Sequence, residues 1–336
     1  MSKYSECGVN TELEGTAIKS LVDALGTELS GIFAKYDYNS GKVLGFSADG
    51  VGSKILCYQA IGNFDGIGYD LVGMNVNDLA CEFIDPMFFV NCIAVDKPEP
   101  NLNKNLGKSL GKACEEAGIL QAGGELASLP DQIKEGTFDW VGFVFGMGDE
   151  NKHRYYIKKR GELRPDLIVL GIESSGIHSN GLTLARKLYE KGMVDLYDEV
   201  PGSDKTLGEE LTTPTKIYSP LMNELKENAE FFAHITGGGY KNLLRVLPKN
   251  LYAKLELSEP KPIFKLIQEK LSVPEREMYG VFNMNYGLLV GVKKDQLDEV
   301  IDKIEKKGEV CKELGYLVEG SRKVIINDNI VLEKYQ

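Results

Sequence analysis

The sequence lacks the usual marks of a membrane-bound, secreted or disulfide-stabilised protein. No segment approaches the roughly 18 to 20 consecutive apolar residues that a membrane span needs. Acidic residues recur through the first 30 positions, where a signal peptide needs an apolar core. The 6 cysteines are scattered without a C-x-x-C pair, which argues against a zinc ribbon and a disulfide framework. We therefore expect a soluble, cytoplasmic protein with reduced thiols, no membrane association and no cysteine nucleophile.

Basic charge is also scarce. The chain carries 39 Lys and Arg residues against 50 Asp and Glu residues, a net charge of -11 at pH 7. Such a charge repels a phosphate backbone unless the basic residues cluster. The longest basic stretch, 152–160, is interrupted by aromatic residues and followed by Glu162, as in a solvated connector. We expect no binding to nucleic acid.

The chain is well supplied with apolar residues and glycine. Of its 336 residues 43% are hydrophobic, which provides more core than one domain usually organises. The 37 glycines exceed the average share of about 7%, whereas the 12 prolines fall below theirs. Residues 151–166 are poor in apolar side chains and end in Arg-Pro-Asp before a new buried strand. This pattern predicts an N-terminal domain over 1–160 and a C-terminal domain over 161–336.

Strand-like and helix-like segments alternate, which indicates an α/β fold. Short runs rich in Val, Ile and Phe predict strands at 42–48, 87–95, 140–147, 167–172 and 287–292. Residues 295–307 predict a covering helix, because their apolar side chains recur at i, i+3, i+4 and i+7. The segment 37–41 has the turn residues of a hairpin and lacks the spacing of a calcium loop.

One candidate site follows the first of these strands, at 48–54 (A-D-G-V-G-S-K). The strand delivers Asp49 to its end, Gly50 and Gly52 allow a ligand to approach the backbone, and Lys54 adds a positive charge. The segment is not a Walker A loop, because Val51 stands where that motif needs lysine. A tight turn with an exposed acid accounts for it equally well.

Further acids come from two other segments. Asn75, Asp78 and Glu82 recur at i, i+3 and i+7, which predicts a polar seam on an otherwise apolar helix. That seam is either capped by the protein or faces a metal ion. Glu125 follows Gly123 and Gly124. If Asp49, Asp78 and Glu125 meet in space, they offer the hard oxygen ligands that suit magnesium bridging to phosphates.

Two glycine-rich and serine-rich clusters mark the second half. His178 lies in 174–181 (S-S-G-I-H-S-N-G), and His234 precedes the triple glycine at 237–239. Backbone amides in such turns can form anion-binding nests. A lone histidine is more often a structural group, which is our interpretation of His153 and His234, whereas the surrounding donors favour a functional role for His178.

Taken together, these segments resemble the phosphoribosylformylglycinamidine cyclo-ligase (aminoimidazole ribonucleotide synthetase) family of purine biosynthesis, within the PurM-like ATP-dependent superfamily. The resemblance runs nearly end to end. It rests on 4–9 (Y-S-E-C-G-V), 49–54 (D-G-V-G-S-K), 68–79, 123–125 (G-G-E), 174–181, 233–239 (A-H-I-T-G-G-G) and 277–283 (E-M-Y-G-V-F-N).

The resemblance implies a two-domain α/β (α+β) protein whose N-terminal domains form a shared β-barrel across a homodimer. It also implies ATP-dependent cyclisation of formylglycinamidine ribonucleotide to 5-aminoimidazole ribonucleotide, with ADP and phosphate released. Magnesium would be held by Asp49, Asp78 and Glu125. Catalysis would involve Lys54, His178 and Asn180. The nucleotide would be bound through Asp49, Gly50, Gly52, Lys54, Asp70, Asn77, Gly237, Gly238 and Gly239.

The sequence departs from the family pattern at three places: 30–34 (S-G-I-F-A), 126–131 (L-A-S-L-P-D) and 284–287 (M-N-Y-G). Two alternatives therefore remain at this stage. One is a same-fold small-molecule kinase or phosphate-donor synthetase, like thiamine monophosphate kinase or selenophosphate synthetase. The other is a non-catalytic nucleotide-binding assembly factor.

Overall fold

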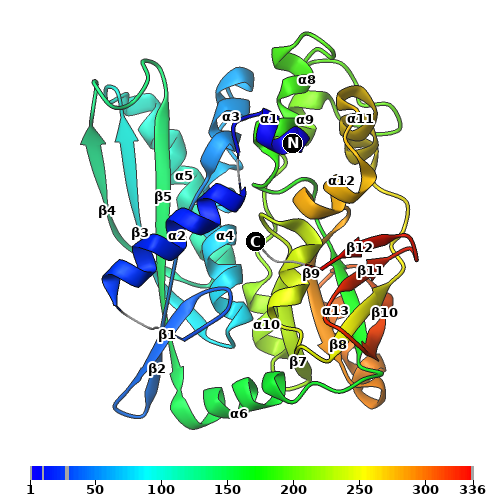
Figure 1. The fold of residues 1–336 in the computed structure, drawn as a ribbon. Coiled ribbons are helices and arrows are strands. Elements are labelled where there is room, and N and C mark those ends of the chain that lie inside the picture. Colours follow the sequence, from blue (N-terminus) through cyan, green and yellow to red (C-terminus); the bar gives the residue numbers. More distant parts are fainter. Residues whose placement is uncertain (1, 10, 27–29, 334–336) are drawn as a thin grey trace.

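Two β-sheets organise the chain, one in each half (Figure 1). The computed structural model describes residues 2–9, 11–26 and 30–333. All five predicted strands are confirmed, each extended or shifted by at most a few residues. Among the described residues, no helix combines the length and the apolar character that a membrane crossing requires.

The first sheet has the strand order β1-β2-β5-β3-β4. Its neighbours pair antiparallel except β3 and β4, which are parallel. Ser40 and Gly41 connect β1 to β2 with φ values of 51° and 74°, the left-handed backbone of a two-residue hairpin turn. The predicted hairpin is therefore confirmed. The strands are β1 (Lys35–Asn39), β2 (Lys42–Gly50), β3 (Asp85–Val95), β4 (Leu120–Ser128) and β5 (Phe138–Asp149).

Helices α4 (Ile67–Cys81) and α5 (Pro100–Ala117) cover one face of this sheet. Helix α4 packs against β2, β3 and β5, and α5 packs against α4 (Figure 1). Leu71 and Leu79 of α4, with Phe89 and Trp140 of the sheet, are completely buried in this layer. The other face carries exposed apolar side chains. The remaining helices of this half are α1 (Lys3–Glu6), α2 (Thr11–Leu25), η1 (Gly52–Lys54), α3 (Ile55–Ile61) and α6 (Glu150–Gly161).

The second sheet is larger, with the order β12-β11-β8-β10-β6-β9-β7. Its central strands β6 and β9 are almost entirely buried, as continuous apolar sequences predict. The strands are β6 (Ile168–Glu173), β7 (Ala229–His234), β8 (Leu251–Leu255), β9 (Tyr286–Val292), β10 (Cys311–Glu319), β11 (Val324–Ile326) and β12 (Ile330–Leu332).

Helices and turns surround this second sheet. The predicted helix is confirmed as α13 (Leu297–Lys306), with Val300 and Ile304 completely buried. The others are α7 (Leu182–Ala185), α8 (Lys187–Glu190), α9 (Leu207–Thr212), α10 (Ser219–Leu225), η2 (Gly239–Arg245), α11 (Pro262–Leu271), α12 (Glu275–Val281) and η3 (Lys294–Gln296).

Helix α4 also forms the contact between the two halves. Gly66, Asp70, Gly73 and Asn77 follow one another at intervals of three or four residues, so they share one side of the helix. A Cβ atom on Gly66 would lie 2.5 Å from Pro214 Cγ, and one on Gly73 would lie 3.0 Å from Thr215 Cγ2. The two glycines therefore let the chain around Pro214 approach the helix backbone.

Asp70 holds this contact together. Its Oδ1 accepts hydrogen bonds from Lys54 Nζ at 2.7 Å, and from Thr215 N at 2.8 Å and Oγ1 at 2.7 Å. Ser179 Oγ donates to the same oxygen at 3.1 Å, and Tyr58 donates to Oδ2 at 2.5 Å. Asp70 and Lys54 are both completely buried. Because groups from both halves converge on one carboxylate, the pair fixes the halves relative to each other.

We predict that Asp70→Asn lowers the free energy of unfolding by about 3–5 kcal/mol, because it leaves the Lys54 ammonium buried without a counter-charge. Urea denaturation followed by circular dichroism measures the change. The control is Asp302→Asn, which breaks an exposed pair with Lys306 and should cost under about 0.5 kcal/mol. Equal effects of the two substitutions would show that the buried pair does not link the halves.

Candidate functional site

A cavity of about 920 Å³ lies between the two halves, within the size range of small-molecule sites. Its first wall comes from the end of β2 and the following turn, with Met74 of α4. Its second wall comes from the loop before α7, the glycine turn after β7, and α12. Residues near the N-terminus, including Tyr4 and Glu14, line it as well. Predicted site residues on its surface are Asp49, Gly50, Gly52, Asn180, Gly237 and Gly238.

Asp49 marks the acidic end of this cavity. Gly50 N donates to Asp49 Oδ1 at 2.7 Å, and the side chain of Asn75 donates to the Asp49 carbonyl at 3.1 Å. Burial, reinforced by the negative charge of Asp78, raises the pKa of Asp49 to about 6. Besides burial, the nearby negative charge of Asp78 therefore disfavours the ionised form of Asp49, an arrangement that a bound cation stabilises.

Asp78 lies on the last turn of α4, where its Oδ1 is 2.8 Å from His234 Nδ1. The Asp78 side chain is 14% exposed and that of His234 is completely buried. His234 Nε2 lies 3.4 Å from Asn77 Nδ2. His234 is therefore a buried partner that orients an acid of the site, in agreement with its structural interpretation.

The third predicted metal ligand lies elsewhere. Glu125 is an exposed residue of the edge strand β4. Among the residues that the structure describes, no group of three or more Asp, Glu, His or Cys side chains is placed to hold a metal ion. Asp49, Asp78 and Glu125 thus do not converge within one chain.

Glu82, the last member of the predicted seam, is capped by the protein. Its Oε2 pairs with Arg160 at 2.9 Å, and its Oε1 accepts from the backbone of Ile32 at 2.7 Å and Phe33 at 2.6 Å. The seam therefore divides. Asp78 pairs with His234 and its charge acts on Asp49, whereas Glu82 is a buried structural group.

Lys54, Asp70 and Asn77 also serve the contact between the halves. Besides Asp70, Lys54 Nζ bonds the Thr213 carbonyl at 2.6 Å, and burial lowers the pKa of this lysine against the opposing effect of Asp70. Asn77 Oδ1 accepts from Tyr218 N at 2.7 Å. None of the three lines the cavity. The predicted contact of Lys54 with phosphate does not fit this arrangement, because its ammonium is enclosed by protein groups.

The second wall carries Asn180, Gly237 and Gly238. Asn180 Oδ1 lies 3.2 Å from the position of a Cβ atom on Gly237, and its Nδ2 lies 3.8 Å from Met74 Sδ. Asn180 therefore spans the space between α4 and the glycine turn.

His178 lies beneath this wall and not in the cavity. It is 1% exposed, has a φ of 64°, and packs against Gly287, where a Cβ atom would come within 2.5 Å of the ring. Within the described part of the chain neither ring nitrogen has a hydrogen-bond partner. Burial lowers the pKa of His178 well below its ordinary value, so the ring is neutral at pH 7. The proton-donating role stays a prediction that this arrangement does not favour.

Comparison with known proteins identifies the family. Residues 32–147 match the family described as AIR synthase related protein, N-terminal domain, and residues 164–327 match its C-terminal domain. A phosphoribosylformylglycinamidine cyclo-ligase of Carboxydothermus hydrogenoformans is 39% identical over 95% of this chain and 94% of the relative. One of Bacillus mycoides is 35% identical over 95% and 96%. This chain belongs to the phosphoribosylformylglycinamidine cyclo-ligase family.

Solved structures share the fold of this cyclo-ligase family member. Thiamine monophosphate kinase of Aquifex aeolicus superimposes with a TM-score of 0.62 at 15% identity, covering 93% of this chain and 96% of that one. The hydrogenase maturation protein HypE in complex with ATP gives 0.62 at 12% identity, covering 89% and 86%. The PurM-like α/β fold is therefore confirmed. Because the full-length relatives are cyclo-ligases, the chain is an enzyme of that kind, and the kinase and assembly-factor alternatives are not favoured.

Two cations that line the cavity, Lys241 and Arg276, are not among the residues predicted from the sequence. Lys241 comes two residues after the triple glycine, and Arg276 directly precedes the 277–283 motif. Only their position next to these two motifs in the sequence indicated that they could lie at the site. Either side chain alone looks like an ordinary surface cation.

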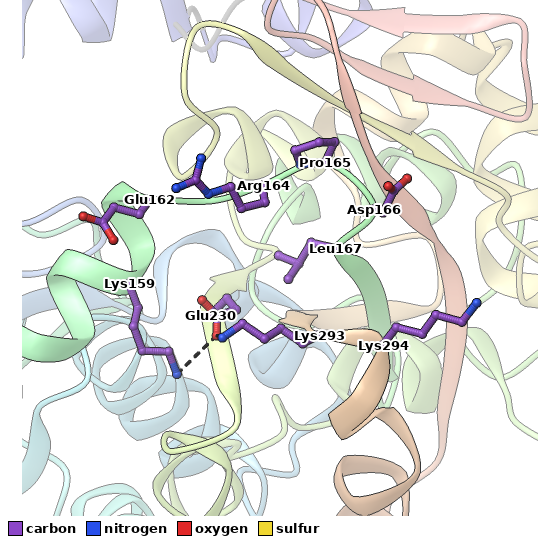
Figure 2. A pocket seen from close by; sticks show the side chains of 9 residues that line it. All are labelled: Lys159, Glu162, Arg164, Pro165, Asp166, Leu167, Glu230, Lys293 and Lys294. Carbon is purple, nitrogen blue, oxygen red and sulfur yellow. Dashed lines mark ion pairs between the residues drawn. The ribbon is translucent and has the colours of Figure 1, made fainter.

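A second hollow, of about 390 Å³, lies at the linker between the halves and contains none of the predicted residues (Figure 2). Its buried centre is Glu230, whose Oε1 is 3.3 Å from both Lys159 and Lys293. Acidic and basic side chains nearly balance here, so we interpret it as a paired surface crevice. The lining residues are Lys159, Glu162, Arg164, Pro165, Asp166, Leu167, Glu230, Lys293 and Lys294.

The raised pKa of Asp49 gives a testable dependence of stability on pH. The folded protein holds a proton at Asp49 more tightly than the unfolded chain does, so stability falls between the unfolded pKa of about 4 and the folded value of about 6. In magnesium-free buffer above pH 7, we predict that the free energy of unfolding of Asp49→Asn is about 1–2 kcal/mol larger than that of wild type. The difference should vanish near pH 4. Denaturant titrations at several pH values measure it, and a difference that is constant from pH 4 to 8 would contradict the prediction.

Proposed function

We propose that the cavity between the halves is the active site, in which ATP drives ring closure of formylglycinamidine ribonucleotide to 5-aminoimidazole ribonucleotide. The full-length similarity to curated cyclo-ligases, at 39% identity over 95% of the chain, carries this proposal. The ATP complex of a protein with the same fold supports use of the nucleotide. The proposed setting is the cytoplasm.

The reaction needs positioning and charge neutralisation more than it needs strong acids or bases. ATP transfers its terminal phosphoryl group to the formyl amide oxygen. The amidine nitrogen of the same molecule then attacks that carbon, which closes the imidazole and expels phosphate. Asn180 is placed to orient the reacting amide, because it lies between α4 and the glycine turn at Gly237. His178 supports the loop of Asn180 from beneath.

Magnesium fits the acidic end of the cavity. Asp49 and Asp78 present two hard oxygen donors. Burial and, after it, the negative charge of Asp78 raise the pKa of Asp49, and a bound cation would offset both effects. When bound there, magnesium neutralises phosphate charge. Gly50 and Gly52 leave the backbone next to Asp49 open to the phosphates of ATP. Glu125 is a proposed ligand only if another chain brings it to the site.

We predict that Asp78→Asn reduces ADP release by about 100-fold or more at fixed magnesium, because it removes a charge that holds the cation. A coupled ADP-release assay with formylglycinamidine ribonucleotide measures the rate, with thiamine monophosphate as the comparison substrate. Asp131→Asn, an exposed acid, is the control and should keep full activity. If ADP release occurs with thiamine monophosphate and not with the ribonucleotide, the proposed function is wrong.

We also propose a homodimer formed through the open face of the first sheet. This face exposes apolar side chains from four neighbouring strands: Phe46, Phe88, Val90, Leu120 and Phe143. Strand register places Phe46 and Phe88 on either side of Phe145, and Val90 beside Phe143, so the patch is continuous. An apolar sheet face with the edge strand β4 at its border is typical of an interaction surface. The shared β-barrel is the arrangement we propose for it.

We predict that Phe143→Glu converts the dimer into a monomer, because it places a charge in the middle of this face. Light scattering should give twice the chain mass for wild type and a value near 37.1 kDa for the variant. Tyr197→Glu is the matched control, since Tyr197 is 73% exposed on the other half. A wild-type protein of 37.1 kDa with full activity would rule out the dimer.

A further inference from the structure

Two cations lie side by side on the second wall of the cavity. The triple-glycine turn packs tightly on α12, because a Cβ atom on Gly239 would lie 2.3 Å from the Tyr279 carbonyl oxygen. Lys241 follows this turn and crosses Gly280, where a Cβ atom would lie 3.5 Å from its Cε and 3.7 Å from its Nζ. Arg276 is four residues before Gly280, on the same face of α12. Lys241 and Arg276 both line the cavity.

The two walls of the cavity differ in charge. Its first wall ends in Asp49, with Asp78 behind it, whereas its second wall carries two positive charges. Among the described residues Arg276 has no ion-pair partner, and the acid beside it, Glu277, accepts a hydrogen bond from Tyr4 N at 2.7 Å. Glu14 is the other acid on the cavity surface.

Asn180 lies between the two ends. Its amide contacts Met74, which is one helical turn before Asp78 on α4, and it also lies against Gly237, at the start of the glycine turn. A group that reacts beside Asn180 therefore has an acidic wall on one side and a basic wall on the other.

We propose that Lys241 and Arg276, with the backbone at Gly237 and Gly238, form the subsite for the phosphate monoester of the nucleotide substrate. The proposal rests on the proposed function, and the curated relatives are named for a phosphoribosyl compound. A phosphate monoester carries a charge near -2 at pH 7, which suits a lysine point charge and the planar fork of arginine. ATP occupies the acidic end, because phosphates bind next to carboxylates only when a cation lies between them. The subsite selects substrates that carry a terminal phosphate.

Direct binding tests this assignment without catalysis. The probe is ribose 5-phosphate, titrated by calorimetry into wild type, Lys241→Ala, Arg276→Ala and the double variant, in the absence of ATP. We expect each single substitution to weaken binding by roughly 10-fold, and the double variant to show no measurable binding. Arg164→Ala is the matched control, because Arg164 is an exposed cation of the linker hollow (Figure 2), and it should bind as wild type does. Circular dichroism checks that each variant is folded.

Steady-state kinetics supply the second arm. In Lys241→Ala and Arg276→Ala, KM for the ribonucleotide should rise by at least about 10-fold, while KM for ATP changes less than twofold. Unchanged affinity of the double variant for ribose 5-phosphate overturns the proposal. A rise of KM for ATP alone overturns it as well and assigns the wall to ATP. Failure of wild type to release ADP with the ribonucleotide refutes the proposed function instead, and the ribose 5-phosphate titration still decides whether this wall binds a phosphate monoester.

Discussion

The geometry of the cavity depends on one buried carboxylate. Asp70 accepts hydrogen bonds from Lys54, which ends the turn that begins at Asp49, and from Ser179, the neighbour of Asn180. The two walls are thereby tied to the same oxygen, Oδ1 of Asp70. A buried acid of this kind is expensive to desolvate and is tolerated only when its partners are complete. Loss of any Asp70 partner would therefore both destabilise the fold and change the distance between the two walls of the cavity.

The buried ions between the halves and the ions that line the cavity have different roles. The ions at the contact between the halves, Lys54 and Asp70, neutralise each other away from solvent. Two other ions, Asp49 and Arg276, lie on opposite walls of the cavity. A pair that is buried and matched positions the chain, whereas charges that are exposed to a cavity and unmatched are available to ligands.

Sequence patterns predicted correctly those elements whose structure depends on residues close by in the chain. The five strands, the hairpin and α13 follow from local periodicity and turn residues, and all are confirmed. What the sequence left open depends on distant partners. Glu82 looked equivalent to Asp78 on the helix, and only the fold brings Arg160 to it across 78 positions. Lys54 is predicted to contact phosphate, and no spacing rule reveals that Asp70 is its partner in the fold. The division of the chain at 160 and the roles of the site residues stay predictions.

Three glycines are explained by close contacts of this kind. At Gly66 and Gly73 a side chain would push the chain around Pro214 and Thr215 away from α4, and the Asp70 contacts would open. At Gly239 a side chain would strike the Tyr279 carbonyl and separate Lys241 from α12. The first two glycines set the distance between the halves, and the third sets the position of one wall. At these three positions glycine is needed because two segments approach closely, so each serves the spacing of a two-walled site and not flexibility.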